Sequence, residues 1–244
     1  MKIALFSDIH ANLPALEAFF EDLETRNVDA IYCLGDLVGY NVWANEVVNE
    51  IRNRKIPTIA GNHDEKVKKI SAEVPNDKNY AYNIIGDEEK SYLSALPAHI
   101  KLTFQLNETN LTLLLVHGSP NSNKEYLLAE TVDETFLTLF KEFQTDILCF
   151  GHTHKPFHKI LNVGVDGKNH FHHAINIGSV GKPKDGDTRG CYVLLTFNQN
   201  SSIFDKESIQ VEFIRFEYDI EKAAKAIESS LLPNEYAEML RNAF

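Results

Sequence analysis

The sequence predicts an α/β fold with its functional residues gathered at one edge of a sheet. Short apolar runs alternate with amphipathic helical segments, and most of these runs end in Asp, Asn or His. The length of 244 residues suits one large domain, so we expect residues 1–244 to form a single unit. In open α/β sheets, ligands bind at the carboxyl ends of the strands, where residues distant in sequence meet.

The first part of the chain has the order strand, helix, strand, helix, strand. Strands are expected at KIALF, AIYCL and PTIA, which are residues 2–6, 30–34 and 57–60. The first helix is predicted by apolar residues at helical spacing and by Pro14 in its first turn, and the second by Val47, Val48 and Ile51. This order predicts parallel strands with right-handed crossovers.

Residues 65–97 interrupt the pattern. They are polar, mostly helix-forming, and begin directly after the GNHD motif. We expect a small helical insertion that acts as a lid and contacts the substrate through Tyr80 and Tyr82. The alternative is a surface excursion whose tyrosines pack on the core.

The remaining elements follow the same rules of periodicity and turns. Residues 101–106 and 110–116 predict a hairpin, Thr131 and Glu134 fit a capping box, and 147–150 predicts a strand. Four later runs predict an antiparallel meander that forms a second sheet: residues 157–161, 171–177, 191–197 and 211–216. Residues 223–232 predict a terminal helix.

The composition limits the kinds of binding partner and the cellular compartment that we expect for this protein. The net charge of −11 disfavours long nucleic acids, whose binding rests on Lys and Arg. Cys33, Cys149 and Cys191 each lie in an apolar run, which indicates reduced core thiols and a reducing compartment. No run resembles a signal peptide or a membrane span, so we expect a cytoplasmic protein without membrane partners. An oligomer is compatible with this sequence.

Five short motifs carry side chains that bind metals. They are Asp8 and His10 in SDIH, Asp36 in LGDLVG, Asn62 and His63 in AGNHD, His117 in VHG, and His152 and His154 in GHTH. Carboxylate, carboxamide and imidazole groups suit Mn²⁺, iron or Zn²⁺. Each motif alone is weak, but together they indicate a two-metal site of the kind that promotes displacement at phosphorus.

The other five histidines are interpreted as ordinary core or surface residues. They are His99, His158, His170, His172 and His173. The alternative for His172 or His173 is a position facing the metal site.

These motifs resemble those of the calcineurin-like metallophosphoesterase superfamily, and most closely its small bacterial and archaeal phosphodiesterases. D-x-H, G-D, G-N-H-D, H and G-H-x-H span positions 8 to 154, and residues 176–187 are similar to a later segment of that branch. Within the branch, the chain is similar to bacterial asymmetric diadenosine-tetraphosphate hydrolases.

The resemblance implies a four-layer α-β-β-α sandwich of two mixed sheets with two divalent metal ions. Mn²⁺ or iron is expected first and Zn²⁺ second. By the family pattern, one metal is held by Asp8, His10 and His154, the other by Asn62, His117 and His152, and Asp36 bridges them with one oxygen to each ion. A hydroxide between the metals then attacks phosphorus.

The resemblance also gives His63 a catalytic role. It either protonates the leaving oxygen or stabilises charge on the phosphoryl group. The NH₂ group of Asn62 is free to bind a phosphoryl oxygen. Asp64 either orients the His63 ring or acts as a turn or cap residue.

One departure from the family's phosphatases indicates the substrate class. Those enzymes continue G-D with Asp-Arg-Gly, whereas GDLVGY lacks the Arg that binds a phosphate dianion. We therefore expect small phosphodiesters or the phosphoanhydride chain of a dinucleoside polyphosphate. Lys182, Lys184 and Arg189 are candidate contacts to distal phosphates, and the alternative is that they are solvated loop charges. Asymmetric cleavage of diadenosine tetraphosphate would release AMP and ATP. A DNA nuclease and a non-catalytic scaffold of the same fold are the alternatives.

Overall fold

The computed structural model describes residues 1–67, 79–164 and 169–244, and contains two β-sheets. The first sheet has the order β2-β1-β8-β9. Its strands are β1 Lys2–Phe6, β2 Ala30–Cys33, β8 Gly190–Thr196 and β9 Gln210–Phe216. The strands β1 and β2 are parallel, as the sequence predicts, while β8 is antiparallel to both β1 and β9.

The second sheet has the order β3-β4-β5-β7-β6. Its strands are β3 His99–Gln105, β4 Asn110–Val116, β5 Ile147–Phe150, β6 Phe157–Asn162 and β7 Phe171–Asn176. The predicted hairpin of β3 and β4 is confirmed, and β5 is parallel to β4 and to β7. Both sheets are therefore mixed.

Alternating side chains explain why the two sheets pack face to face. In β1, Leu5 joins a core shared with residues of the second sheet such as Leu113, while Phe6 points to the opposite face. In β4, Leu114 likewise points away from that shared core. Because successive strand residues face opposite sides, each sheet has one face toward its partner sheet and one toward helices.

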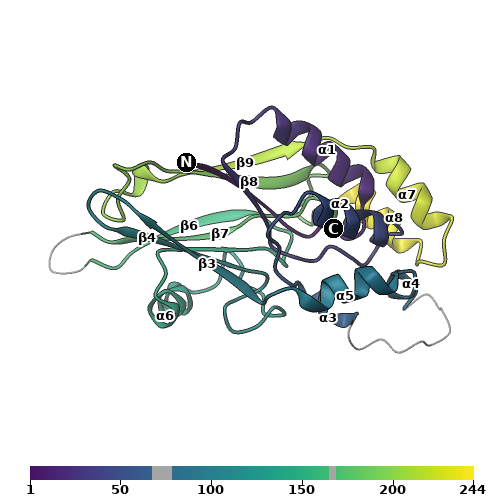
Figure 1. The fold of residues 1–244 in the computed structure, drawn as a ribbon, viewed down its shortest axis with the longest axis horizontal. Helices are drawn as coiled ribbons and strands as arrows, with labels where there is room; N and C mark the ends of the chain where they lie inside the picture. Colours follow the sequence, from purple (N-terminus) through teal and green to yellow (C-terminus); the bar gives the residue numbers. More distant parts are fainter. Residues whose placement is uncertain (68–78, 165–168) are drawn as a thin grey trace.

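The helices form the two outer layers (Figure 1). The outer face of the first sheet is covered by α1 Leu13–Glu24, α2 Ala44–Asn53, α7 Ile220–Glu228 and α8 Glu235–Asn242. The outer face of the second sheet packs on α6 Asp133–Phe143 through Phe136 and Phe140. This arrangement confirms the predicted four-layer sandwich.

Two strand predictions need correction. Residues 57–60 form no ladder strand, because Pro57 has no N–H to donate, and only a bridge joins Thr58 to Cys33. The predicted meander is wrong as a single sheet. Its first two strands, β6 and β7, belong to the second sheet, and its last two, β8 and β9, to the first.

Two helix predictions also need correction. The Thr131–Glu134 capping box does not form, because α6 begins at Asp133 with Val132 at its N-cap, and the Thr131 hydroxyl accepts from the Leu128 N–H. The predicted terminal helix ends earlier, at Glu228, and a second helix, α8, follows it. Pro233 lies between them.

The insertion at 65–97 contributes short helices beside the site. Its described parts include α4 Tyr80–Asn83 and α5 Asp87–Ala95, which follow α3 Asn62–Lys66. Residues 68–78, which belong to the predicted lid, lie outside the described residues. The three cysteines are buried, as predicted. Within the described part of the chain, every helix is too short or too polar to cross a bilayer.

Candidate metal centre

The predicted ligands meet where the strands of both sheets end. Asp8 and His10 follow β1, Asp36 follows β2, His117 follows β4, and His152 and His154 follow β5. Asn62 and His63 open the short helix α3. No member of this set is more than 8% exposed. Residues up to 146 positions apart in sequence thus form one buried polar cluster, as the motif order predicts.

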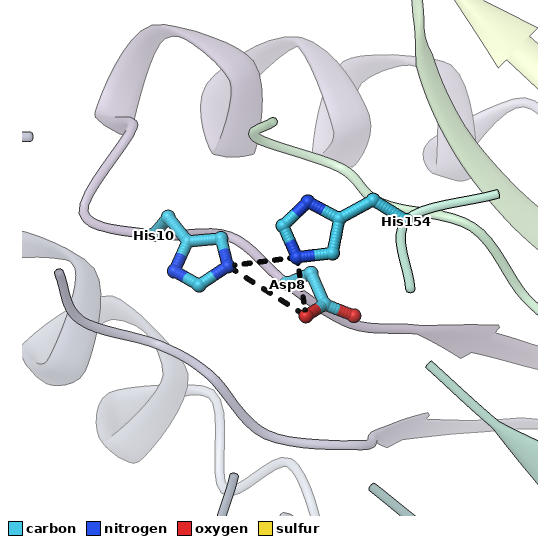
Figure 2. A group of neighbouring side chains, drawn as sticks. All are labelled: Asp8, His10 and His154. Carbon is cyan, nitrogen blue, oxygen red and sulfur yellow. Dashed lines mark hydrogen bonds and ion pairs between the residues drawn. The ribbon is translucent and has the colours of Figure 1, made fainter. Parts of the chain in front are cut away.

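The first group of donors consists of Asp8, His10 and His154 (Figure 2). The Oδ1 atom of Asp8 lies 3.1 Å from His154 Nε2 and 3.6 Å from His10 Nε2. The two Nε2 atoms lie 3.1 Å from each other. Three potential ligand atoms therefore converge on one point.

The outer nitrogens of these rings fix their tautomers. The Nδ1 atom of His10 lies 3.1 Å from the Val38 carbonyl, and that of His154 lies 2.5 Å from the Lys182 carbonyl. A carbonyl accepts only, so each Nδ1 donates its N–H, and each neutral ring keeps a lone pair on Nε2. Two lone pairs and a carboxylate oxygen facing one another repel, and a cation between them removes that repulsion. The donor set fits a metal ion.

The second group contains Asp36, His117 and His152, with Asn62 beside it. The Nε2 atom of His117 lies 3.3 Å from Asp36 Oδ2 and 3.1 Å from Asn62 Oδ1. Its Nδ1 donates to the Leu34 carbonyl at 2.8 Å, so Nε2 is the nitrogen left to bind either a proton or a metal ion. His152 Nε2 is buried and has no hydrogen-bond partner within the described residues. This group also fits a cation.

Asp36 lies between the two groups. Its Oδ1 accepts a hydrogen bond from the His63 backbone N–H at 2.7 Å. Its Oδ2 lies 3.7 Å from His10 Nε2 and 3.3 Å from His117 Nε2. The carboxylate thus faces both groups, but with one oxygen, because the other is occupied by the backbone. The bridging role expected of Asp36 is compatible with this position.

The ligand backbone is held in an unusual conformation. Asp8, His10, Asp36, His152 and His154 all have positive φ angles, between 52° and 65°. Such left-handed residues are strained and need support from their surroundings.

Part of this support comes from Asp64. Its Oδ2 accepts from the N–H groups of Asp36 at 2.8 Å and Gly61 at 2.9 Å, and its Oδ1 accepts from Leu37 N–H at 2.9 Å. Of the two roles considered for Asp64, the structure shows the turn and cap role.

Two motif glycines are required by close packing against carboxylates. A Cβ atom on Gly61 would lie 2.1 Å from Asp36 Oδ1, and one on Gly151 would lie 2.4 Å from Asp8 Oδ2. No side chain fits at these distances. The G in both G-N-H and G-H-x-H therefore makes room for a metal-facing carboxylate from the other side of the site.

Burial and mutual attraction set the charges in the cluster. Burial opposes ionisation of both carboxyls, but His154 holds the pKa of Asp8 well below its usual range, and His117 does the same for Asp36. Burial would lower the pKa of His117, yet Asp36 raises it to about 10. Burial lowers the pKa of His154 to about 4 despite Asp8. The carboxylates are thus ionised, as metal binding requires.

His63 is held beside the donors by a tyrosine of the insertion. The Tyr82 hydroxyl lies 2.5 Å from His63 Nδ1, and the Tyr82 ring is only 8% exposed. Burial lowers the pKa of His63 to about 3, so the ring is neutral at pH 7. A donor atom of His63 also lies within 4.8 Å of donors on His10 and Asp36. The insertion therefore reaches the site through Tyr82.

The other predicted substrate residues lie further out. Tyr80 packs partly buried against the core, and Arg189 pairs with Asp187 at 2.7 Å. Neither joins the cluster through an interaction recorded among the described residues. His172 stacks on Phe140, so the alternative that placed it at the metal site is not supported.

Sequence reasoning missed one residue at the edge of the site, Tyr126. Tyr126 stacks on His152 with ring centroids 4.3 Å apart, yet is 58% exposed. Asp8 and Asp36 attract the Lys184 ammonium, although burial lowers the pKa of this lysine overall. No motif marks Tyr126. Lys184 is one of the loop cations considered from the sequence as contacts to distal phosphates, and this role stays a prediction.

A cavity of about 300 Å³ adjoins the second donor group. Its lining is mostly polar and includes His117, Glu65, Ser119 and Asn121. It is large enough for part of a small ligand whose reactive group lies at the cluster.

Comparison with known proteins identifies the family. Residues 1–200 match the model of the calcineurin-like phosphoesterase superfamily domain. The chain is 33% identical to the uncharacterized protein MJ0912 of Methanocaldococcus jannaschii, over 98% of this chain and 96% of that one.

Two solved structures resemble it along nearly their whole length. A metallophosphoesterase from Sphaerobacter thermophilus has a TM-score of 0.76 and 28% identity, covering 100% of this chain and 99% of that one. The hypothetical protein PH1004 from Pyrococcus horikoshii OT3 has a TM-score of 0.74 and 21% identity, covering 100% and 98%. The chain belongs to the calcineurin-like phosphoesterase superfamily.

Proposed function

We propose that this member of the calcineurin-like phosphoesterase superfamily hydrolyses small phosphodiesters and phosphoanhydrides, with dinucleoside polyphosphates as its nucleotide substrates. The observation that carries the proposal is the pair of buried donor groups that share Asp36 Oδ2. Two divalent ions held there would supply Lewis acidity toward phosphoryl oxygens and a water that loses its proton near neutral pH. Mn²⁺ or iron is the favoured pair, and Zn²⁺ the alternative.

The ligand roles follow from the two groups. Asp8, His10 and His154 would hold one ion, and Asn62, His117 and His152 the other. Since Asn62 Oδ1 faces His117 Nε2, its NH₂ group is the part that remains for a phosphoryl oxygen.

His63 would act on the substrate from beside the metals. With the Tyr82 hydroxyl donating to Nδ1, the neutral ring carries its proton on Nε2. That N–H can donate a hydrogen bond to a phosphoryl or leaving-group oxygen as charge develops there. Of the two roles considered for His63, the low pKa favours charge stabilisation by a neutral donor.

The surroundings favour a substrate with little charge at the reacting phosphorus. GDLVGY provides no guanidinium for a phosphate dianion, and Arg189 is paired with Asp187. Lys184 provides a single positive charge near Asp8. The exposed ring of Tyr126 offers a stacking surface for a base, an interaction worth about 1–3 kcal/mol per base.

One experiment tests the substrate class. The metal-reconstituted protein is assayed on bis-nitrophenyl phosphate, nitrophenyl phosphate, diadenosine tetraphosphate and single-stranded DNA, and nucleotide products are separated by chromatography. We expect turnover of the diester, and AMP with ATP from the dinucleotide. Two ADP molecules would refute asymmetric cleavage, rapid hydrolysis of the monoester alone would refute the diester preference, and DNA cleavage would indicate a nuclease. Inactivity on all four would favour a scaffold.

A further inference from the structure

A second cluster of metal-binding side chains lies at the other end of β5. Asp146 directly precedes this strand, whereas the catalytic His152 and His154 follow it. His170 and His172 lie at the start of β7, the parallel neighbour of β5. A strand rises about 3.3 Å per residue, so a strand length of roughly 13 Å separates this cluster from the catalytic ligands.

Three donor atoms in this cluster face one another. Asp146 uses Oδ2 to accept from the Thr112 N–H at 2.8 Å, and its Oδ1 lies 3.4 Å from His170 Nε2. One donor atom each of Asp146, His170 and His172 lies within 4.8 Å of the other two. The Nδ1 atom of His172 is buried and makes no hydrogen bond of good geometry within the described part of the chain, although the backbone of Thr145 and Asp146 interacts with the ring.

The surrounding packing holds these side chains in place. The His172 ring lies between Phe140 of α6 and His170, with ring centroids 4.5 Å away on each side. The Asp146 backbone donates to the Thr112 carbonyl and accepts from the His173 N–H, both at 3.0 Å. The donors are therefore attached to β4, β5 and β7 at once, and little side-chain freedom remains to be lost on binding a ligand.

An ordinary ion pair between Asp146 and His170 explains only part of this arrangement. It leaves a buried nitrogen of His172 without a hydrogen bond of good geometry, which costs free energy. We propose that Asp146, His170 and His172 bind a transition-metal ion such as Zn²⁺ at a site separate from the catalytic centre. Two donors about 2.0–2.1 Å from a tetrahedral ion are about 3.4 Å apart, as Asp146 Oδ1 and His170 Nε2 already are.

The partial exposure of the cluster agrees with this chemistry. The side chains of His170 and Asp146 are 24% and 16% exposed, so an ion reaches the site from solvent and water completes its coordination. One carboxylate and two imidazoles form a borderline donor set that favours Zn²⁺ or Co²⁺ over Mg²⁺. The bound ion would link the starts of β5 and β7 and stabilise the second sheet.

The test counts metal ions on the full-length protein. Co²⁺ is titrated into the metal-free chain and followed by visible absorption, and bound metal is measured after gel filtration. His170→Asn removes one ligand, and His172→Phe removes another while keeping an aromatic ring on Phe140. His158→Asn, at a partly buried histidine outside every donor group, is the matched control. We expect wild type and the control to bind one more ion per chain than either cluster variant.

Two further readouts separate this site from the catalytic one. Turnover of a nitrophenyl diester should be equal in all four proteins. With Zn²⁺ at 100 times its dissociation constant, wild type should gain about 5–10 °C in Tm beyond the gain of either variant. Equal metal content in wild type and His170→Asn, or equal Tm gains, would overturn the proposal whatever the catalytic assay shows.

Discussion

Asp64 shows how a residue outside the donor groups fixes the geometry within them. By accepting three backbone N–H groups, it holds Asp36 in a left-handed conformation that would otherwise be strained. It is fully buried next to the Asp36 carboxylate, and burial raises its pKa to about 7. The D that follows G-N-H is therefore structural, although its neighbour His63 is proposed to contact substrate.

The convergence of the donor side chains could be predicted from the sequence because each motif pairs such a side chain with a glycine or a strand end. The contact between Tyr82 and His63 could not be predicted from the sequence. Its hydroxyl reaches His63 only because the insertion folds back over α3, and no spacing in the sequence encodes that contact. Tyr126 was missed for the same reason, since its neighbour His152 is distant in sequence.

We predict that His63→Ala lowers turnover of a phosphodiester by about 10²–10³-fold, the usual range for removal of one hydrogen-bond donor to a developing charge. Metal content should equal that of wild type, because His63 is assigned to the substrate and not to a metal. Because His63 lies close to His10 and Asp36, the metal content of His63→Ala is measured to decide whether His63 is a metal ligand. Loss of a bound ion would make His63 a ligand instead.

We predict that Tyr82→Phe lowers kcat by about 10–100-fold, the range seen when a group that orients a catalytic or ligating histidine is removed. Without the hydroxyl, His63 can turn and can adopt the other tautomer. The Tm and metal content should stay constant, because the buried ring is retained.

Tyr80→Phe is the matched control for Tyr82→Phe, since Tyr80 lies two residues away and packs on the same core. It should retain full activity. If the two variants behave alike, the Tyr82 hydroxyl does not position His63.

At the scale of elements, the apolar periodicity predicts where helices and strands lie in the sequence. It does not predict which sheet each strand joins. Every residue of β8 except the last is buried, so its sequence does not show which face meets the other sheet. Four consecutive runs of this kind fit one meander as well as two hairpins in different sheets. The strand predicted at PTIA was wrong for a different reason. One proline in so short a run leaves too few backbone N–H donors for a ladder.

Asn12 joins the start of α1 to the segment whose Lys182 carbonyl accepts from His154 Nδ1. Its Oδ1 caps α1 by accepting from Ala15 N–H at 3.3 Å, and its NH₂ donates to the Gly181 carbonyl at 2.8 Å. We predict that Asn12→Ala lowers the free energy of unfolding by about 2–4 kcal/mol, from a lost cap of about 1 kcal/mol and an unpaired buried carbonyl of about 1–3 kcal/mol. Urea unfolding of the metal-free protein measures this.

Asn12→Ser separates the two contributions. Serine caps a helix but is too short to reach Gly181, so this variant should be about 1 kcal/mol more stable than Asn12→Ala. Equal stabilities would show that the cap contributes nothing.

Across the whole molecule, the metal centre is a junction between the sheets. Asp8 and Asp36 extend from the first sheet, and His117 and His152 from the second. Protein contacts already cross this junction: His152 N–H donates to Asp8 Oδ2 at 3.0 Å, and His117 Nδ1 donates to the Leu34 carbonyl at 2.8 Å. The family motifs predicted the sandwich because they require both sheets to end at one point, which local periodicity does not reveal.

Because ions at this junction bind the folded chain only, their removal should destabilise the entire protein. At 100 times the dissociation constant, binding stabilises by about 2.7 kcal/mol, which corresponds to about 5–10 °C in Tm for a chain of this size. We predict that chelation lowers the Tm by at least this amount and that Mn²⁺ restores it. Thermal unfolding followed by circular dichroism checks this, with His170→Asn as the background so that the second cluster does not contribute.

In that background, His117→Asn should abolish most of the Mn²⁺ effect, since it removes a ligand of the second sheet, whereas His63→Ala should retain all of it. If Mn²⁺ does not change the Tm of the His170→Asn protein, the two donor groups do not hold ions, and the proposed chemistry is refuted as well.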